Sequence, residues 1–581
     1  MKYIKNKNLY LTLLEIFSFL EIKRKKQFIV IILLSFITSI LEVATLGALV
    51  PFLKIILDNS VLNFREGNFF YISQIFNINT PTKSIIFFST VFIFFSLLSG
   101  FLRIYLLSYS IKLANLAGAD IGSEVYRKTL FQSYQVHTKE GSSFVISGIV
   151  KKIQDVTISL FSVVNFFSSI LIFLSIFFFI VYIDPTLILT SIIFFSLIFI
   201  LFSIIIKKKL ILNSEKISKE QNAIIKSLQE GLGSIRDVLL NQSQDSYIKI
   251  YKSSISNLNK SNGENEFLNQ LPKLFIETVV IVFIGLLILV LSFLERSLTS
   301  SLTSVGILIL GSQKMLPLLN KIYVSWSTLL GRKRGLEDIF FLLSKRIETT
   351  INDSNSLFSI NSIEFRNVNF KYDTSSSYVF KNLNIFWEKK KRIGIAGKTG
   401  SGKSTFLDLL TGLLKPSNGE IFVGGKILNH QTDNSWKKQL SYISQQIYLS
   451  DSSILNNIAI SDQFGVIDRV RAENCAKRVK IHDFIISNGG YEVLVGERGV
   501  RLSGGQKQKI GIARALYKKS NLIIFDESTS ALDSQSENEV LQSIYELNKD
   551  IMIIIVSHRS STLKNCDEIY EVKERKLVKI S

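Results

Sequence analysis

The sequence predicts a two-part fold, in which an α-helical membrane domain of six transmembrane helices is fused to an α/β domain of the P-loop type. Long, largely uncharged apolar segments occupy the first half of the chain. From about residue 361, short β-rich runs alternate with helical stretches, and this alternation is typical of a mostly parallel α/β sheet. Within this second half, the stretch G-K-T-G-S-G-K-S-T at 397–405 lies between an apolar run and an amphipathic helix.

The apolar segments of the first half are long enough to cross a bilayer, which takes about 20 apolar residues in a helix. A helix of a soluble core would carry a polar face, but the run at 166–183 shows no such face. The sixth segment is interrupted by Lys314, Pro317, Asn320 and Lys321. The predicted spans are 28–50, 85–107, 163–183, 186–206, 274–294 and 302–323.

The chain carries 68 Lys and Arg residues against 47 Asp and Glu residues, which gives a formal net charge of +21. Basic clusters at 23–26, 151–152, 207–209 and 332–334 flank the spans on one side, whereas the loops of the other side hold few basic residues. This is the positive-inside pattern. We therefore expect an integral protein of the bacterial inner membrane, with both termini in the cytoplasm. Because no basic module with interleaved aromatic residues is present, we expect no nucleic-acid partner.

The change of pattern along the chain predicts the domain boundaries. We expect a transmembrane domain at residues 1–335, a polar linker at 336–360 and an α/β P-loop nucleotide-binding domain at 361–581. Within the last domain, β-rich composition predicts strands at 363–372, 392–396, 440–444, 522–526 and 551–556.

The stretch at 397–405 has the composition of a phosphate cradle, with Gly397, Gly400 and Gly402 able to adopt backbone angles that are closed to other residues. Several N–H groups can then point at one anion, and the helix that follows adds its positive N-terminal end. Lys403 can reach the terminal phosphates, and the Ser404 hydroxyl can ligate Mg²⁺. A Gly/Ser turn with a chance lysine does not account for the full G-x-x-x-x-G-K-S spacing between a strand and a helix.

A pair of carboxylates, Asp526 and Glu527, follows a buried strand, and L-S-G-G-Q stands before it at 502–506. One carboxylate at such a strand end can hold Mg²⁺ through water, and the next can polarise an attacking water. Alone, the pair would be a solvated strand end. Its occurrence with the P-loop, with Gln445 after one strand and with His558 after another favours hydrolysis chemistry.

With these motifs the chain resembles the ATP-binding cassette exporters over nearly its whole length. The resemblance implies that ATP and Mg²⁺ bind, that Glu527, His558 and Gln445 act in hydrolysis, and that Ser404, Gln445 and Asp526 hold the metal. Tyr372 matches the aromatic residue that stacks on adenine, and Asp533 matches the loop after the catalytic carboxylate. The remaining nucleotide-binding positions are Gly397, Gly400, Gly402, Lys403, Ser404, Thr405, Ser503, Gly504, Gly505 and Gln506.

In this family each ATP site is built from one P-loop and the L-S-G-G-Q signature of the other domain. The chain has one of each, so the resemblance implies a partner, and a second copy of the chain is the simplest partner. ATP would hold the two nucleotide-binding domains together, and hydrolysis would release them. The spans would then alternate between inward-facing and outward-facing states.

Charged residues inside the predicted spans indicate where cargo could bind, because such charges are costly and usually functional. Arg103, Lys273 and Lys314 could form a basic strip for an anionic head group. Glu42 and Glu277 leave an alternative open, in which the charges form internal ion pairs such as Glu42 with Arg103.

Among the exporters, the chain is most similar to the flippases for lipid-linked oligosaccharides, in S-I-L-E-V-A-T-L-G-A-L-V-P-F of the first span, L-P-K-L-F-I-E of the fifth and K-M-L-P of the sixth. This resemblance implies an amphipathic, anionic membrane lipid or lipid-linked substrate. A multidrug or lipid A-type exporter is the alternative, and a cassette-gated channel is a further one. Soluble cassette ATPases lack membrane spans, and the fusion of spans and cassette favours export over import.

Overall fold

In the computed structural model the chain divides into two compact units, Met1–Phe131 with Glu140–Arg346 and Gln132–Lys139 with Ile347–Ser581. For 50–57, 185–201, 287–293 and 298–312 the backbone alone is described. The described residues are 8–57, 81–139, 141–183, 185–293, 298–345, 347, 360–372, 377–389, 391–428, 434–462, 465–527, 537, 539–540, 542 and 551–581.

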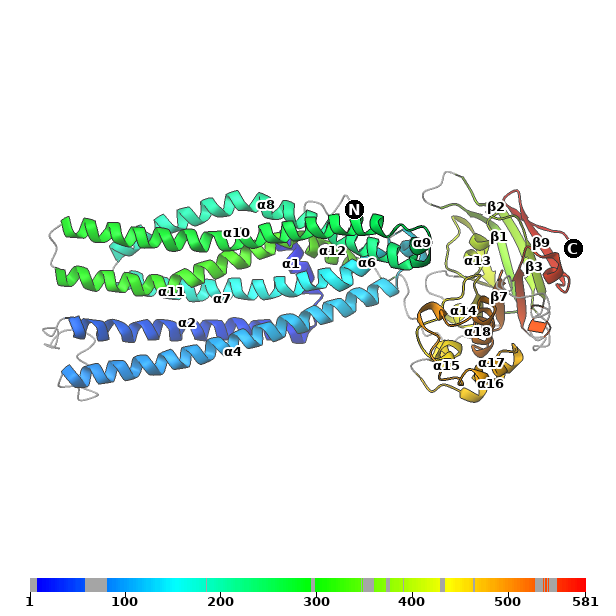
Figure 1. Cartoon of the computed structure of the whole chain (residues 1–581), viewed down its shortest axis with the longest axis horizontal. Helices are drawn as coiled ribbons and strands as arrows, with labels where there is room; N and C mark the ends of the chain where they lie inside the picture. The colour runs from blue at the N-terminus through cyan, green and yellow to red at the C-terminus, as the bar shows by residue number, and fades with distance from the viewer. Residues whose placement is uncertain are drawn as a thin grey trace. The chain divides into compact units, whose positions relative to one another are not determined.

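The first unit is a bundle of long helices that run side by side (Figure 1). The long helices are α2 (Ile22–Leu57), α4 (Pro81–Leu130), α7 (Ile153–Ile183), α8 (Pro185–Gly233), α10 (Gln244–Phe293) and α11 (Leu298–Gly331), and each carries one of the predicted spans. The shorter elements are α1 (Leu9–Ser18), α6 (Ser142–Ser147), the π-helix η3 (Gly148–Lys152), α9 (Ile235–Leu240) and α12 (Lys333–Ser344).

Within the described residues, three helical segments have the length and composition to cross a membrane, namely Ile22–Leu49, Ile85–Leu130 and Ser142–Tyr182. They contain the first three predicted spans. The other three predicted spans lie on α8, α10 and α11, largely where the backbone alone is described. A membrane domain is therefore supported by three clear spans, and the number six stays a prediction.

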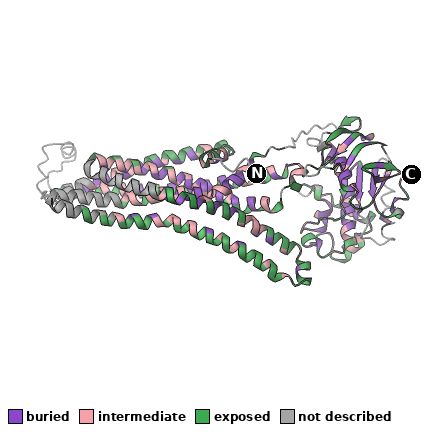
Figure 2. Cartoon of the chain, turned by 90° about the horizontal axis from the view of Figure 1, so that it is seen from above, coloured by how far each residue is buried: buried purple, intermediate pink, exposed green. Residues whose placement is uncertain are grey.

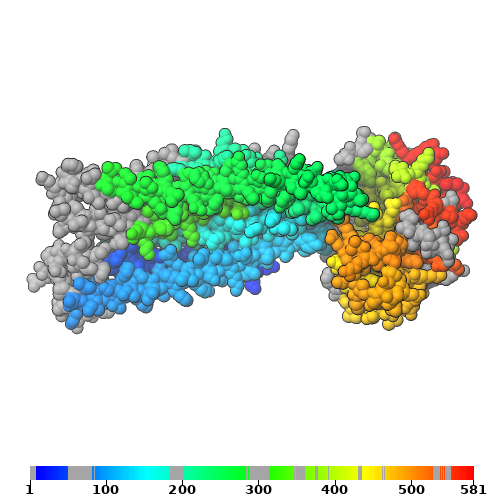
Figure 3. Space-filling view, viewed as in Figure 1, coloured from blue at the N-terminus to red at the C-terminus, as the bar shows by residue number. Residues whose placement is uncertain are grey.

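The outer faces of these helices are apolar, as a lipid-facing surface requires. Leu97, Phe101 and Ile104 of α4 are 71%, 69% and 70% exposed. Figure 2 shows exposed residues along the helices of the first unit, and buried residues concentrated in the sheets of the second. In the space-filling view, α10 in green and α4 in blue flank the cyan α7 (Figure 3). The apolar outer surface of these helices is the reverse of that of a water-soluble helix bundle, whose polar faces are turned outward.

One buried ion pair ties three elements of the first unit together. Lys152 of η3 is fully buried, and its Nζ lies 2.7 Å from Asp338 Oδ2 of α12. Ser218 of α8 donates a hydrogen bond of 2.6 Å to the same carboxylate oxygen. Because α12 packs into this unit, the unit extends to Arg346, past the boundary predicted at residue 335.

The second unit contains a six-stranded sheet of order β10-β9-β3-β8-β7-β6. All neighbouring strands are parallel except β10 and β9, as the alternation of strands and helices predicts. The strands are β3 (Arg392–Ala396), β6 (Leu440–Ile443), β7 (Leu522–Asp526), β8 (Met552–Val556), β9 (Glu568–Lys573) and β10 (Lys576–Lys579).

A second, antiparallel sheet has the order β2-β1-β4-β5, and the sequence analysis did not anticipate it. The strand predicted at 363–372 is β1, but it pairs with β2 and β4 rather than with the parallel strands. The partners of a strand are decided by packing and not by local composition. The β-rich composition therefore predicted that β1 is a strand, but it did not predict to which sheet β1 belongs. The strands are β1 (Ser362–Phe370), β2 (Phe380–Glu388), β4 (Asn418–Val423) and β5 (Lys426–Ile427).

Helix α13 connects the two sheets through one apolar core. Its residue Phe406 is fully buried, and its ring lies 5.2 Å from Phe365 of β1 and 5.8 Å from Trp387 of β2. The helices of this unit are α5 (Tyr134–Lys139), α13 (Lys403–Leu410), α14 (Asn434–Lys438), α15 (Ile454–Ile458), α16 (Arg469–Arg478), α17 (His482–Ser487), α18 (Gly504–Tyr517) and α20 (Ser560–Leu563), with 3₁₀ turns η4 (Ile460–Asp462) and η5 (Glu497–Gly499).

The position of Phe406 predicts the effect of removing its ring. Phe406→Ala should lower the free energy of unfolding of the second unit by about 3–5 kcal/mol, because it leaves a cavity among aromatic rings. Denaturant unfolding of the purified chain measures this change. Phe386→Ala is the matched control, since Phe386 of β2 is 56% exposed and should change stability by no more than about 0.5 kcal/mol. Equal losses in the two variants would contradict the packing role.

Candidate functional site

The P-loop (397–405) connects β3 to α13, and its glycines have the backbone angles that the sequence analysis expects. Gly397, Gly400 and Gly402 have φ values of 151°, 80° and 109°. A Cβ atom at Gly402 would lie 2.9 Å from a side-chain carbon of Val379, so a larger residue would strain the turn in both conformation and packing. The positive φ values let the backbone turn as a phosphate cradle requires.

Two side chains of this loop are suited to hold phosphate oxygens. The Lys403 side chain is 8% exposed, and its Nζ donates a hydrogen bond of 2.8 Å to the Gly397 carbonyl. Ser401 Oγ is buried and has no hydrogen-bond partner among the described residues. A buried hydroxyl without a partner is costly, and a nucleotide phosphate in the loop would supply the missing acceptor.

Glu527 follows β7 in a strained left-handed conformation, with φ of 49°. Its N–H donates a hydrogen bond of 3.0 Å to Val556 O at the end of β8. A non-glycine residue with positive φ is uncommon and often marks a functional position. The turn is thus held by the neighbouring parallel strand, and His558 lies two residues beyond that strand.

The carboxylate of Glu527 contacts three other residues that the sequence analysis predicts for the site. Its Oε1 lies 2.7 Å from His558 Nε2 and 3.6 Å from Lys403 Nζ, and its Oε2 accepts a hydrogen bond of 3.0 Å from Gln445 Nε2. Lys403 Nζ also lies 3.1 Å from His558 Nε2. Because Lys403 can only donate, His558 Nε2 either accepts from Lys403 or donates to Glu527. The structure therefore brings together Lys403, Gln445, Glu527 and His558.

Asp526 has two neighbours that the sequence analysis missed, Tyr442 of β6 and Asp408 of α13. Tyr442 Oη donates a hydrogen bond of 2.6 Å to Asp526 Oδ2. Burial raises the pKa of Asp526, and burial together with the nearby charge of Asp526 raises the pKa of Asp408 to about 6. The pairing of β6 with β7 places Tyr442 opposite Ile524. This register belongs to the tertiary structure, so no local pattern of the sequence pointed to Tyr442.

Tyr372 contacts Thr405, the last residue of the P-loop. Their hydroxyl oxygens are 3.0 Å apart, and the Tyr372 side chain is exposed. Ser404, the first-turn residue expected to hold Mg²⁺, is also exposed. An exposed aromatic ring next to a phosphate cradle can stack on a planar base, which fits the position predicted for adenine.

The signature 502–506 lies apart from this cluster at the start of α18. Ser503 caps the helix and accepts from the Gln506 N–H, and the Ser503 N–H donates to Gln506 Oε1 at 2.8 Å. Gly504 and Gly505 are the first residues of α18. In the described part of the chain, no hydrogen bond or ion pair joins these residues to the P-loop. Asp533 lies outside the described residues.

Two of the cations predicted inside the spans, Arg103 and Lys314, form a cluster around Glu42, which is 2% exposed. Glu42 lies 3.1 Å from Arg103 and 3.0 Å from Lys314, and it accepts a hydrogen bond of 2.9 Å from Ser99. The structure contains the Glu42–Arg103 ion pair, and whether these charges also bind cargo stays a prediction. Lys273 is exposed on α10 and forms no ion pair within the described ranges. The two cations and one carboxylate leave this cluster with one net positive charge.

Together, the fold and the loop cluster define a P-loop nucleotide-binding domain joined to a helical membrane domain. Residues 380–530 match the ABC transporter family, and residues 28–310 match the ABC transporter transmembrane region. These matches place the chain in the ABC transporter family. The chain also shares the fold of a bacterial Atm1-family ABC exporter with ATP bound, with a TM-score of 0.76, 21% identity and coverage of 96% of this chain and 94% of the other.

Two curated relatives are similar over a shorter region. The alpha-hemolysin translocation ATP-binding protein HlyB of Escherichia coli is 38% identical over 217 residues, 37% of this chain and 30% of that protein. The ATP-dependent lipid A-core flippase of Pectobacterium atrosepticum is 38% identical over 217 residues, 37% of each chain. The match thus spans about a third of the length of these relatives.

The raised pKa of Asp408 predicts a pH dependence of stability. Burial raises the pKa of this carboxyl to about 6 in the folded protein, whereas in the unfolded chain it has its ordinary pKa of 3.8. Its stabilising contribution is therefore complete below about pH 4 and is lost as the pH rises to about 6.

Asp408→Asn should remove this loss and stabilise the protein at pH 7 by at most about 3 kcal/mol relative to its effect at pH 4. Thermal unfolding of the full chain between pH 4 and 8 measures the difference. Asp483→Asn, at an exposed position of α17, is the control. A stability difference for Asp408→Asn that does not change with pH would contradict the assignment.

Proposed function

We propose that two copies of this chain form an ATP-driven exporter or flippase, in which ATP hydrolysis at two composite sites drives alternating access. The observation that carries the proposal is the contact of Glu527 with Gln445, His558 and Lys403 beside a phosphate-binding loop, on a chain that also carries membrane-spanning helices. Without such helices the same cluster would support only a soluble ATPase.

Each group of the cluster has a chemical role that its position supports. The P-loop backbone and Lys403 would hold the phosphates of ATP, and Ser404, Gln445 and Asp526 would hold Mg²⁺. Bound Mg²⁺ neutralises charge on phosphate oxygens. Glu527 would orient the attacking water and accept its proton, as a positioned carboxylate can, while His558 keeps the Glu527 side chain in place.

The separation of the signature from the P-loop within one chain supports a homodimer. The capping box of Ser503 and Gln506 uses the N–H groups of these two residues. The N–H groups of Gly504 and Gly505, in the first turn of α18, have no partner within the helix, and they can bind an anion at its positive end. In a symmetric dimer the signature of one copy would cover the P-loop of the other. Both sites would then be complete, and ATP would hold the two domains together.

Glu527→Gln tests the hydrolysis step. The amide keeps the size of the side chain but cannot accept the proton, so we expect steady-state ATPase activity to fall by about 10²–10⁴-fold while ATP still binds. Phosphate release and nucleotide binding by the purified protein are the two measurements. Glu420→Gln, at an exposed position of β4, is the control and should keep full activity. Wild-type turnover by Glu527→Gln would exclude Glu527 as the base.

For the cargo we propose an anionic amphipathic lipid, such as a lipid-linked oligosaccharide, moved across the inner membrane with the nucleotide-binding domain in the cytoplasm. The net positive charge of the Glu42 cluster and the exposed Lys273 support an anionic head group. Electrostatic attraction strengthens where water is excluded. The similarity to a lipid A-core flippase supports the second candidate, a lipid A-type exporter, whose cargo is also a lipid.

Lys273 of α10 and Arg103 of α4 test the cargo site. Lys273→Ala should lower the transport of an anionic lipid-linked substrate in liposomes and leave basal ATPase activity unchanged, because Lys273 holds no ion pair among the described residues. Lys252→Ala, at an exposed position of the same helix, is the control. Arg103→Ala should also lower transport, and in addition should reduce stability, because Glu42 loses a partner.

If transport is unchanged in both Lys273→Ala and Arg103→Ala, these residues do not bind the cargo. If Arg103→Ala loses ATPase activity together with stability and Lys273→Ala has no effect, the charges serve only as internal ion pairs.

A further inference from the structure

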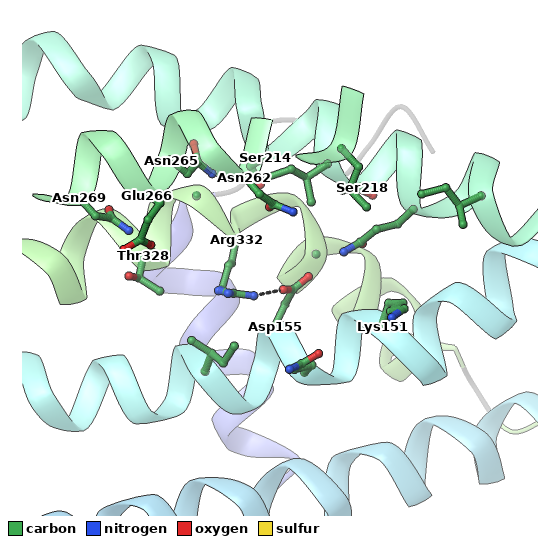
Figure 4. Close-up of a pocket in the computed structure, with 18 of the residues that line it drawn as sticks. Lys151, Asp155, Ser214, Ser218, Asn262, Asn265, Glu266, Asn269, Thr328 and Arg332 are labelled. Carbon is green, nitrogen blue, oxygen red and sulfur yellow. Dashed lines mark hydrogen bonds and ion pairs between the residues drawn. The ribbon is translucent and has the colours of Figure 1, made fainter. Parts of the chain in front are cut away.

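A cavity of about 840 Å³ opens between α7, α8, α10 and α11 in the first unit. Figure 4 shows 18 of its lining residues. The lining comes from these four helices, from Lys151 of η3 and from the start of α12. The volume lies within the range of about 300–1,000 Å³ that is typical of small-molecule sites. The Glu42 cluster contributes no residue to this cavity, so it is a separate site.

The polar lining of this cavity is dominated by carboxamide side chains. A carboxamide presents both a donor and an acceptor, which matches a pair of neighbouring hydroxyl groups better than a single charge does. The six carboxamides are Gln154, Gln221, Asn262, Asn265, Asn269 and Gln270.

Several of these carboxamides are oriented by the protein and retain unused capacity. Asn265 Oδ1 accepts a hydrogen bond of 2.9 Å from Asn213, and Asn269 Oδ1 accepts one from Ser327, so the amino groups of both residues are left to donate to a ligand. Gln221 Oε1 is buried and has no partner in the described part of the chain. A buried acceptor without a donor is costly, and a ligand hydroxyl would satisfy it.

The charged groups of the cavity balance one another. Asp155 is buried and forms an ion pair with Arg332, which Figure 4 marks by a dashed line. The other two charged lining residues are Lys151 and Glu266, one of each sign. A Cβ atom at Gly335 would lie 2.5 Å from Asp155 Oδ2, so glycine there makes room for the ion pair. A cavity without net charge does not favour an anion or a cation.

We propose that this cavity binds an uncharged, hydroxyl-rich ligand, namely the neutral glycan portion of the cargo, and the identification of that ligand as cargo rests on the proposed function. The carboxamides bind the hydroxyl groups. The ring of Tyr251 and the side chains of Ile217, Ile255 and Leu258 cover the apolar C–H faces of the sugar rings. Apolar side chains and directed polar groups together are what orients a ligand in a small-molecule site, and in this cavity the polar groups are the more numerous.

The test measures binding of two neutral probes, tetra-N-acetylchitotetraose and maltotetraose, to the detergent-solubilised full chain by equilibrium dialysis. We expect at least one probe to bind saturably, and Gln221→Leu and Asn262→Ala each to weaken it by about tenfold, the effect of one lost hydrogen bond. Gln221→Leu removes an unpaired buried acceptor and therefore should not unfold the protein. Asn259→Ala changes an exposed residue of α10 outside the cavity and should bind as the wild type does.

The proposal is overturned if neither saccharide binds, if both cavity variants bind as the wild type does, or if triglutamate displaces the saccharide at equal concentration. ATP hydrolysis of the same preparation is measured in parallel. An active ATPase that binds no saccharide excludes the glycan site alone, whereas a wild-type preparation that binds saccharide without hydrolysing ATP supports the glycan site and contradicts the proposed function.

Discussion

The cluster around Glu527 depends on the parallel pairing of β3, β8, β7 and β6, because these four strands end at one edge of the sheet. The P-loop follows β3, His558 follows β8, Glu527 follows β7 and Gln445 follows β6. Carboxyl ends of parallel strands are where ligands bind in open α/β sheets. The hydrogen bonds between neighbouring strands fix where each strand ends relative to the next. Four loops from distant parts of the sequence therefore meet around the carboxylate of Glu527.

Two apolar cores keep this edge rigid. One covers the face of the sheet that α13 and the antiparallel sheet share, with Phe406 and Trp387 at its centre. The other packs α15, α16 and α18 on the opposite strand faces. Because α13 begins at Lys403 and is buried for most of its length, the phosphate-binding loop is anchored by the core itself, and its lysine is held within reach of Glu527.

The membrane unit follows a different rule, since its buried charges are stable only when they are paired. Glu42 pairs with two cations, Lys152 pairs with Asp338, and Asp155 pairs with Arg332. These pairs join helices that are far apart in the sequence. The 840 Å³ cavity lies beside one of them, where carboxamides rather than net charge define its chemistry.

The sequence by itself determined the parts of this protein that depend on local pattern. The glycine spacing of the P-loop, the strands that precede Gln445, Glu527 and His558, and the first three membrane spans are encoded in short segments, because backbone freedom and hydrophobic period act over a few residues. The tertiary structure alone decided what joins distant segments. It placed β1 in a separate antiparallel sheet, brought Tyr442 to Asp526, paired Glu42 with both Arg103 and Lys314, and assembled the carboxamide cavity from four helices. Such contacts follow from packing and register, which a linear pattern of residue types does not specify.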